Sequence, residues 1–315
     1  MAAIVVEHVS KAFRRGLFGV GSTVHALQDV SFEVSAGEAI GIIGPNGAGK
    51  TTMLGCLLGF LRPDQGRVTV DGREPDELSV RARTGYLPER LVMDRWMSGS
   101  TFLRYHHALG GLPAASRRAD CAALLDRVGL DPAARERAIG SYSRGMLQRI
   151  GVAQALLGRP QFVFLDEPIS GVDPSGIVVI RGILEELRRS GATLVINSHQ
   201  LDEVERLCDR IVFVRGGRVE ALEVIRAGAE LARRVRVRFS VSGRQPTDAE
   251  LAGIGERLGS TLVSWSAPDA RFQVKDDAAA TALLGALIAA GWPVVEASAE
   301  ESRLERLFSA AATTT

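Results

Sequence analysis

The first part of the chain alternates short apolar runs with longer segments in which apolar residues recur every three or four positions. Runs such as Ala39–Ile43 and Phe162–Leu165 are typical of strands buried on both faces. A helix is predicted from Asp173-Pro174, an N-cap acid followed by proline at the first helical position, to the residue before Gly191. This alternating order predicts an α/β fold, a mostly parallel sheet covered by helices.

The other elements of this part follow from the same spacing and from glycine and proline positions. Strands are also expected at 4–9, 31–34, 68–70 and 193–197, with a glycine-containing loop between the first two. Helices are also expected at 51–61, 100–128 and 143–157, the second broken at Gly110, Gly111 and Pro113.

After Gly216-Gly217 the pattern changes to alternation with period two, which indicates a strand at 234–241. A helix (248–258), two strands (261–266 and 271–275), a helix (278–290) and a strand (293–297) are expected to follow. This βαββαβ order predicts a small α+β domain of the ferredoxin-like type. The domain boundaries are therefore placed at 1–221, a linker at 222–232, and 233–315.

The strand at 234–241 places Arg234, Arg236 and Arg238 on one face, because side chains alternate along a strand. One hypothesis is a solvated edge strand whose charge prevents aggregation between sheets. The other is that this basic face pairs with acidic residues of a second subunit or of a membrane partner.

The strongest chemical motif is GxxxxGK[ST], which lies between a predicted strand and a predicted helix. Backbone N–H groups of such a loop hold phosphate oxygens, Lys50 reaches the β- and γ-phosphates, and the Thr51 hydroxyl ligates magnesium. Only three lysines occur in the chain, Lys11, Lys50 and Lys275, and one stands where the motif requires it. The predicted nucleotide-binding residues are Gly44, Asn46, Gly47, Gly49, Lys50, Thr51 and Thr52.

The apolar strand at 162–165 ends in two carboxylates, Asp166 and Glu167. The carboxyl end of a buried parallel strand lies beside the phosphate-binding loop, so Asp166 is expected to hold magnesium. Glu167 is then placed to polarise an attacking water as a general base.

With these residues in place, the chain over about 1–220 resembles the ATP-binding subunits of ABC transporters. The segment Tyr142–Arg149 is similar to the family's signature motif, in which Ser143, Arg144 and Gly145 would begin a helix that contacts the γ-phosphate bound by the opposite subunit. The resemblance implies a P-loop NTPase cassette: a RecA-like core, a helical subdomain at about 90–160 and an antiparallel β subdomain. It also implies ATP and Mg²⁺ as ligands.

Three further roles come from the resemblance. Asp173, in Ser-Gly-Val-Asp, matches the D-loop at the dimer seam, and His199 matches the switch histidine that contacts the γ-phosphate. Phe13 would stack on adenine, with Phe18 in the same long loop region as the competing candidate.

Two departures from the commonest family pattern resemble an exporter branch that includes drug, sodium, lipid and gliding-motility cassettes. Glu89 stands where a glutamine usually contacts magnesium and the membrane subunit, and a carboxylate would bind the ion more strongly than an amide. Arg144 and Met146 replace the commonest glycine and glutamine of the signature.

The bulk composition limits the partners. A net charge of +1 gives no reason to expect nucleic acid, and three scattered cysteines fit a reducing cytosol better than a disulfide or zinc framework. Neither a signal peptide nor an apolar run of about 18 residues is present, so a cytoplasmic protein, peripheral on the inner face of the cell membrane, is expected.

The leading interpretation is the ATPase subunit of an exporter, which pairs with itself or a related cassette and acts on separate transmembrane permease subunits. A soluble, non-transport ABC ATPase and an importer ATPase are the alternatives. Soluble types carry two cassettes or long coiled coils, and importers typically carry an all-β appendage; neither pattern occurs in this sequence.

Overall fold

The computed structural model describes residues 2–14, 22–91, 93–199, 201–225, 233–242 and 245–299. The chain divides into two units, 1–227 and 228–315. Each unit has its own hydrophobic core, and each is described separately below.

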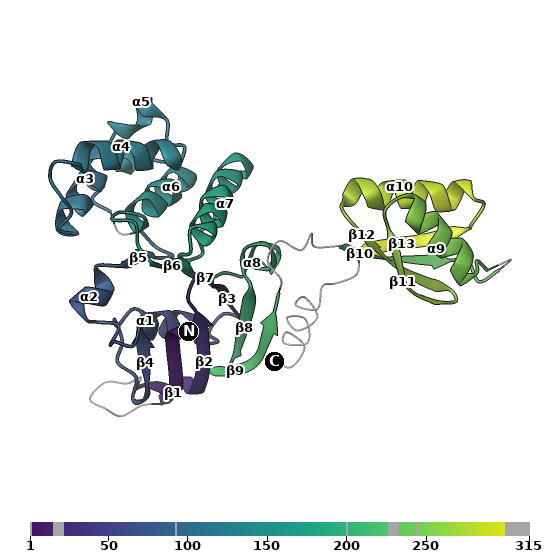
Figure 1. Ribbon diagram of the computed structural model, residues 1–315, viewed down its shortest axis with the longest axis horizontal. Helices are drawn as coiled ribbons and strands as arrows, with labels where there is room; N and C mark the ends of the chain where they lie inside the picture. The colour runs from purple at the N-terminus through teal and green to yellow at the C-terminus, as the bar shows by residue number, and fades with distance from the viewer. Residues whose placement is uncertain are drawn as a thin grey trace. The chain divides into compact units, whose positions relative to one another are not determined.

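The first unit is built on a six-stranded sheet with the order β5-β6-β7-β3-β8-β9 (Figure 1). The first five strands in that order are parallel, and β9 returns antiparallel to β8. Every residue of β3, β6 and β7 is buried, which explains why their sequences are almost wholly apolar. The strands are β3 (Ala39–Ile43), β5 (Thr84–Leu87), β6 (Phe162–Asp166), β7 (Thr193–Asn197), β8 (Arg210–Arg215) and β9 (Arg218–Val224).

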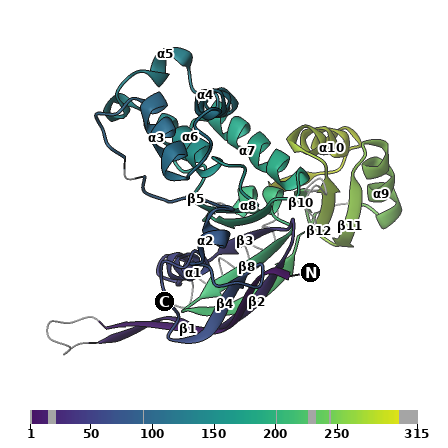
Figure 2. The same cartoon turned by 60° about the vertical axis from the view of Figure 1, so that its left-hand side comes forward.

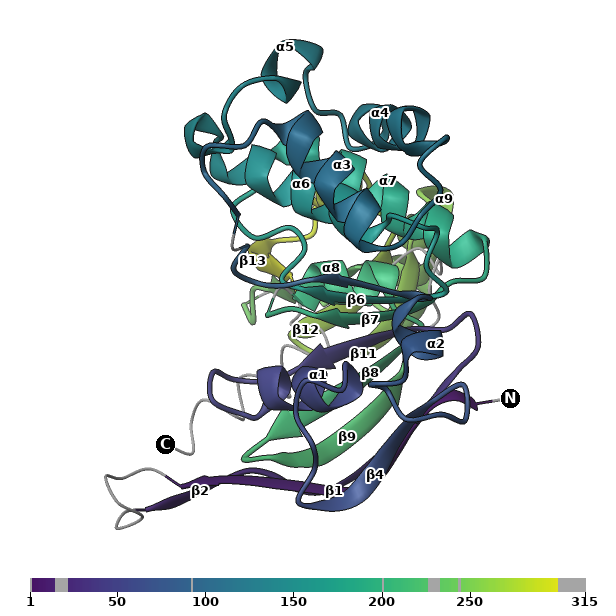
Figure 3. The same ribbon diagram turned by 90° about the vertical axis from the view of Figure 1, so that its left-hand side faces the viewer.

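An antiparallel sheet with the order β2-β1-β4 forms a second layer. Its strands are β1 (Ala2–Arg14), β2 (Thr23–Ser35) and β4 (Gln65–Val70). Figure 3 shows helix α1 (Lys50–Leu57) between the two sheets. Residues such as Val6, Val30, Met53 and Leu54 fill the core between these layers.

Helices cover the other side of the six-stranded sheet, with α3, α4 and α5 gathered beyond its edge strand β5 (Figure 2). Within the described ranges, no helix has both the length and the apolar character needed to cross a membrane. The remaining helices of this unit are α2 (Leu78–Arg81), α3 (Gly99–Leu109), α4 (Arg117–Arg127), α5 (Pro132–Arg135), α6 (Arg144–Ala155), α7 (Pro174–Arg189) and α8 (Leu201–Leu207).

The second unit has the chain order β-α-β-β-α-β and one antiparallel sheet with the strand order β11-β12-β10-β13. Its core contains Val237, Phe239, Leu251, Phe272 and Leu283, all at most 1% exposed. The elements are β10 (Arg233–Phe239), α9 (Asp248–Arg257), β11 (Thr261–Ser266), β12 (Asp269–Val274), α10 (Asp277–Ala289) and β13 (Val294–Ala299).

The expectation of an edge strand at 234–241 is wrong, because β10 lies between β12 and β13. Its basic face also finds its acids inside the same unit. Arg236 donates to both oxygens of Asp269 at 3.0 and 2.9 Å, and Arg238 contacts Asp269 at 3.1 Å and Glu296 at 3.3 Å. Hydrogen bonds from Arg236 lower the pKa of Asp269. These arginines are therefore neutralised locally; the Arg234 side chain lies outside the described residues.

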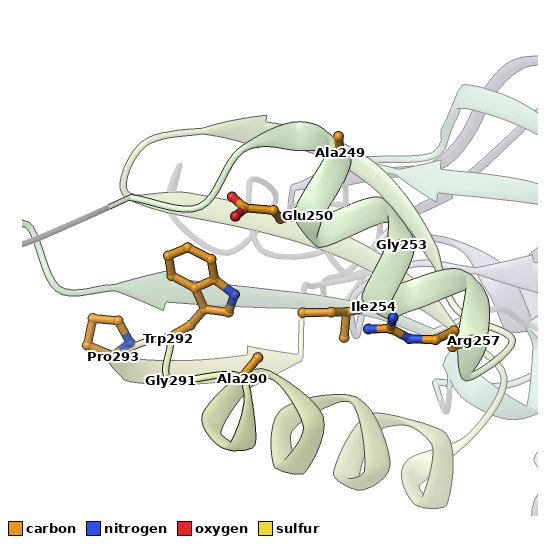
Figure 4. A pocket seen from close by; sticks show the side chains of 9 residues that line it. All are labelled: Ala249, Glu250, Gly253, Ile254, Arg257, Ala290, Gly291, Trp292 and Pro293. Atoms are coloured by element: carbon orange, nitrogen blue, oxygen red, sulfur yellow. The ribbon is translucent and has the colours of Figure 1, made fainter.

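A groove of about 590 Å³ lies between α9 and the C-terminal end of α10 (Figure 4). Small residues on its two sides, Ala249 and Gly253 on α9 and Ala290 and Gly291 after α10, leave it open. Trp292 borders the same groove.

Candidate active site

The loop that joins β3 to α1 has the backbone conformation of a phosphate cradle. Gly44, Gly47 and Gly49 all have positive φ, at 158°, 80° and 108°. A Cβ on Gly44 would lie 2.0 Å from the Val214 carbonyl oxygen, so a larger residue is excluded there. Apart from its two chain neighbours, no residue that the structure describes lies within 4 Å of a Cβ built on Gly47, so this side of the loop faces open space.

Lys50 begins α1 and its side chain folds back over the loop. Its Nζ atom donates to the Gly44 carbonyl at 2.8 Å and to the Pro45 carbonyl at 3.1 Å. Burial lowers the pKa of Lys50, while the charges of Glu167, Asp166 and Glu89 act in the opposite direction. The ammonium group therefore lies above the glycine loop and within electrostatic reach of three carboxylates.

Asp166, the last residue of β6, is only 2% exposed. Its Oδ1 atom accepts a hydrogen bond of 2.5 Å from Nδ2 of Asn197, the last residue of the neighbouring strand β7. Burial raises the pKa of Asp166 to about 6; the Asn197 bond lowers it, and the Glu89 and Glu167 charges raise it further. A buried carboxylate whose charge is disfavoured by burial and by neighbouring carboxylates is stabilised when a cation binds to it.

The raised pKa predicts that Asp166 destabilises the nucleotide-free chain at neutral pH. The folded state binds the Asp166 proton more tightly than the unfolded state, so the contribution of this one group to the stability of the wild-type chain falls as pH rises from about 4 to about 6. We expect Asp166→Asn to stabilise the free chain by about 2 kcal/mol at pH 7.5, with little gain at pH 4. Urea unfolding at both pH values, without nucleotide or metal, measures this. An equal effect at both pH values would contradict the assigned cause.

Glu167 follows Asp166 in a left-handed conformation, with φ of 53°. Its N–H donates to the Asn197 carbonyl at 2.8 Å, and its own carbonyl accepts from Nε2 of Gln148 at 3.0 Å. Its Oε1 atom accepts from the His199 N–H at 3.0 Å and lies 2.8 Å from His199 Nδ1. Since a carboxylate can only accept, Nδ1 carries the proton in this contact. The Glu167 carboxylate is thus held at the end of the sheet by the segment that follows β7.

The predicted magnesium ligands lie on three adjacent elements. Thr51 is exposed at the start of α1, Asp166 ends β6, and Glu89 follows β5, which pairs with β6 in parallel. The charge of Glu89 reaches both Lys50 and Asp166. A hydroxyl and carboxylates around one cationic side chain provide the hard oxygen donors that Mg²⁺ prefers, so these residues fit the ion.

Ser143, Arg144 and Gly145 lie at the start of α6. The Ser143 Oγ atom accepts from the Met146 N–H at 3.3 Å and so caps the helix. Arg144 Nη2 donates to Ser170 Oγ at 2.8 Å, and a Cβ on Gly145 would lie 3.4 Å from Asp173 Oδ1. In this chain the signature segment therefore packs against the loop that precedes α7.

Asp173 caps α7: its carboxylate accepts from the Gly176 N–H at 3.3 Å and pairs with Arg149 Nη2 at 3.2 Å. Its side-chain hydrogen bond from Ser175 is the main reason that the pKa of Asp173 is lowered. The expected D-loop residue is thus anchored to α6 through Arg149.

Phe13 lies in β1, opposite Val24 of β2, and is 38% exposed. The P-loop reaches the same hairpin, because a Cβ on Gly49 would lie 2.3 Å from the Ala26 carbonyl oxygen. The competing Phe18 lies outside the described residues. Asn46 is exposed, and Thr52, in α1, is half-buried.

Several residues of the site were not predicted from the sequence: Asn197, Ser198, Gln148 and Ser170. Ser198 Oγ lies 3.4 Å from Glu167 Oε2, and the other three hold Asp166, Glu167 and Arg144 as described above. A signal was available for Asn197 and Ser198, which end and follow a buried strand of the same parallel sheet. Gln148 and Ser170 lie in the segments that resemble the signature motif and the D-loop, but their contacts with Glu167 and Arg144 could not be inferred from the sequence.

Comparison with known proteins identifies the class. Residues 27–170 match the family described as ABC transporter. The ATP-binding protein NatA of Bacillus subtilis is 36% identical over 200 residues, which cover 62% of this chain and 80% of NatA. The chain therefore belongs to the ATP-binding subunits of ABC transporters, a family of cassette ATPases, and the expected cassette fold is confirmed.

Two other relatives cover less of their own length. An uncharacterised ABC transporter ATP-binding protein of Nostoc sp. is 41% identical over 69% of this chain and 64% of that protein. The doxorubicin resistance ATP-binding protein DrrA of Mycobacterium tuberculosis is 36% identical over 68% of this chain and 63% of DrrA. The chain thus spans less than two thirds of the length of these relatives.

The solved structure of the ATP-binding cassette MJ0796, a dimer bound to ADP and phosphate, superposes with a TM-score of 0.65. The match covers 71% of this chain and 99% of MJ0796, at 23% identity. It confirms the fold of the first unit.

Proposed function

We propose that this chain binds MgATP at the P-loop and hydrolyses it, and that the free energy drives a transmembrane partner that exports a substrate. Gly44–Thr52 would hold the phosphates, with the Lys50 ammonium on the β- and γ-phosphates. Magnesium, when bound, would neutralise phosphate charge from a position between Thr51, Asp166 and Glu89. Phe13 would stack on the adenine ring.

One observation carries this proposal: Lys50, Asp166 and the Glu167–His199 pair lie together where the parallel strands β3, β6 and β7 end. The Glu167 carboxylate is held by His199, in the segment after β7, where it can accept a proton from water. His199 orients that oxygen and would contact the γ-phosphate. These groups suit phosphoryl transfer to water, in which positioning and charge stabilisation supply most of the catalysis.

The signature segment supports a site completed by a second cassette. In the chain itself Arg144 contacts Ser170 and Gly145 lies next to Asp173, and none of the contacts described for residues 143–145 reaches Lys50 or Gly44. The capped start of α6 provides a serine hydroxyl, free N–H groups and the positive end of a helix for an anion. Two copies, or this chain and a related cassette, would each offer this end to the γ-phosphate of the other.

Export and a peripheral position on the cytoplasmic membrane face are inferred from the sequence features of the exporter branch, Glu89 and the Arg144-containing signature. The name of DrrA, a doxorubicin resistance protein, agrees with this direction. Co-purification of this chain with a candidate membrane subunit, followed by transport into inside-out vesicles, tests it. ATP-dependent release from preloaded inside-out vesicles would indicate import instead, and activity with no membrane partner would favour a soluble ATPase.

We further propose that the second unit is a ferredoxin-like accessory domain, separate from the nucleotide site. Its chain order and its β11-β12-β10-β13 sheet support this. All the proposed phosphate and magnesium ligands precede residue 200.

A chain that lacks residues 228–315 should therefore bind ATP with an affinity within about twofold of the full chain, since it keeps every proposed ligand and the whole first unit. Titration of both chains with a fluorescent ATP analogue measures this. A loss of affinity in a truncated chain that still unfolds cooperatively would show that the second unit contributes to the nucleotide site.

A further inference from the structure

Lys11 is the first of the chain's three lysines, and the proposed reaction does not use it. Its Nζ atom donates to Asp64 Oδ1 at 2.7 Å, and its side chain is only 17% exposed. The other oxygen of Asp64, Oδ2, accepts from the Ala12 N–H at 2.7 Å. The Asp64 carboxylate thus accepts hydrogen bonds from Lys11 and Ala12, the two residues that precede Phe13.

Asp64 lies at the point where the pairing of β1 with β4 ends. Strand β4 begins at Gln65, opposite Ser10, so β1 has no β4 partner beyond Ser10. Asp64 continues the attachment where the ladder ends: its N–H donates to the Ser10 carbonyl at 2.8 Å, and its carboxylate takes the Ala12 N–H. Without the Asp64 side chain, Lys11 and Ala12 would lose these hydrogen bonds on the β4 side of β1.

The attachment extends to the Phe13 ring. Lys11 and Phe13 share one face of β1, and Lys11 Nζ lies 5.8 Å from the ring centroid, within the range of a cation–π contact. On the other side of β1, Lys11 and Ala12 pair with Leu27 and His25 of β2. Ala26, between those two, is the residue that Gly49 of the P-loop contacts.

The charges of the same pair reach the P-loop helix. Burial is the main reason that the pKa of Cys56 in α1 is raised to about 11, and the charges of Lys11 and Asp64 also act on it. A hydrogen bond from Lys11 is the main reason that the pKa of Asp64 itself is lowered. The end of β1 that carries Phe13 is thus fixed by Asp64 on one side, and on the other side it pairs with the part of β2 that contacts the P-loop.

We infer that Asp64 is a positioning residue that, through Lys11 and the Ala12 backbone, holds Phe13 in place for the adenine ring. It therefore sets how tightly the base is bound, while the phosphate groups depend on the P-loop. This inference rests on the proposed ATP site and adds to it a residue outside every motif of the sequence.

The test compares two ligands in the full chain, MgATP and magnesium tripolyphosphate, which lacks the base and sugar. Asp64→Ala should weaken MgATP binding about fivefold, the range of a lost aromatic contact, and change tripolyphosphate binding by less than about twofold. Phe13→Leu should give the same pattern. The Phe13→Leu/Asp64→Ala double variant should be no weaker than Phe13→Leu alone, because Asp64 acts through Phe13.

Glu7→Gln is the matched control, since Glu7 and Arg67 pair at 2.5 Å between the same two strands. It should leave both affinities unchanged. If Asp64→Ala does not fold, Asp64→Asn keeps the side-chain volume and should show a smaller loss for MgATP alone. Equal losses for both ligands, additive effects with Phe13→Leu, or unchanged MgATP affinity would each overturn the inference. Failure of the wild-type chain to bind either ligand would instead reject the proposed function.

Discussion

Glu167→Gln should reduce the rate of ATP hydrolysis by about 100- to 10,000-fold, the contribution of a general base, while ATP affinity changes by less than about twofold. Glutamine keeps the volume of the side chain and an oxygen that can accept from the His199 N–H, which lies at 3.0 Å in the native chain. It removes only the capacity to take a proton from water. Phosphate release and ATP titration measure the two quantities separately.

The control for this variant is Glu185→Gln, an exposed carboxylate on α7 that should leave the rate unchanged. We also expect the Glu167→Gln chain to accumulate as an ATP-bound dimer, because hydrolysis no longer separates the two subunits. Wild-type rates in Glu167→Gln would remove Glu167 from its proposed role.

Lys50→Arg should be nearly as damaging as Lys50→Ala, with a loss of at least about 100-fold in kcat/KM, the scale of a lost charge-stabilising donor. The Lys50 ammonium lies within 2.8 and 3.1 Å of two loop carbonyls and is 9% exposed. The planar guanidinium of arginine is larger and cannot occupy this compact position, although its charge is the same.

Lys275→Arg, the same substitution at an exposed lysine of the second unit, is the matched control and should have no effect. Steady-state kinetics of the three variants give the comparison. If Lys50→Arg retained most of the wild-type kcat/KM, charge alone would be sufficient at this position.

Much of the fold could be predicted because its signals are local. The buried strands at 39–43 and 193–197 and the strand at 261–266 begin and end where their apolar patterns do. Asp173 and Ser143 cap their helices, as their positions indicated. Strands β5, β8 and β9 and helix α8 were not predicted. Strand β5 has only four residues, and β9 and α8 carry mixed polarity, but the buried apolar run 211–214 of β8 was an available signal.

Features that depend on distant residues could not be read from the sequence. Residues 222–224, assigned to a linker, extend β9 because they pair with β8. The basic face of β10 is neutralised by Asp269, which is 33 positions from Arg236, and no local pattern shows that pairing. The same holds for Asn197 on Asp166 and for Asp64 beneath Lys11.

The P-loop, Asp166 and Glu167 were found from the sequence because each follows a strand directly, so chain order fixes which edge of the sheet it occupies. The structure adds how they are held: the Gly44 and Pro45 carbonyls under Lys50, Asn197 on Asp166, and His199 on Glu167. Their roles in binding and hydrolysis stay predictions that the variants above address.

The most direct measurement is the rate of phosphate release from saturating MgATP by the purified wild-type chain, over a wide range of protein concentration. The proposed site takes Lys50 and Glu167 from one subunit and Ser143 from another, so the rate per chain should rise with concentration and approach a plateau as dimers form. The rate should vanish when magnesium is chelated. No phosphate release above the Glu167→Gln background at any concentration would contradict the assignment of this chain as an ATP-hydrolysing cassette.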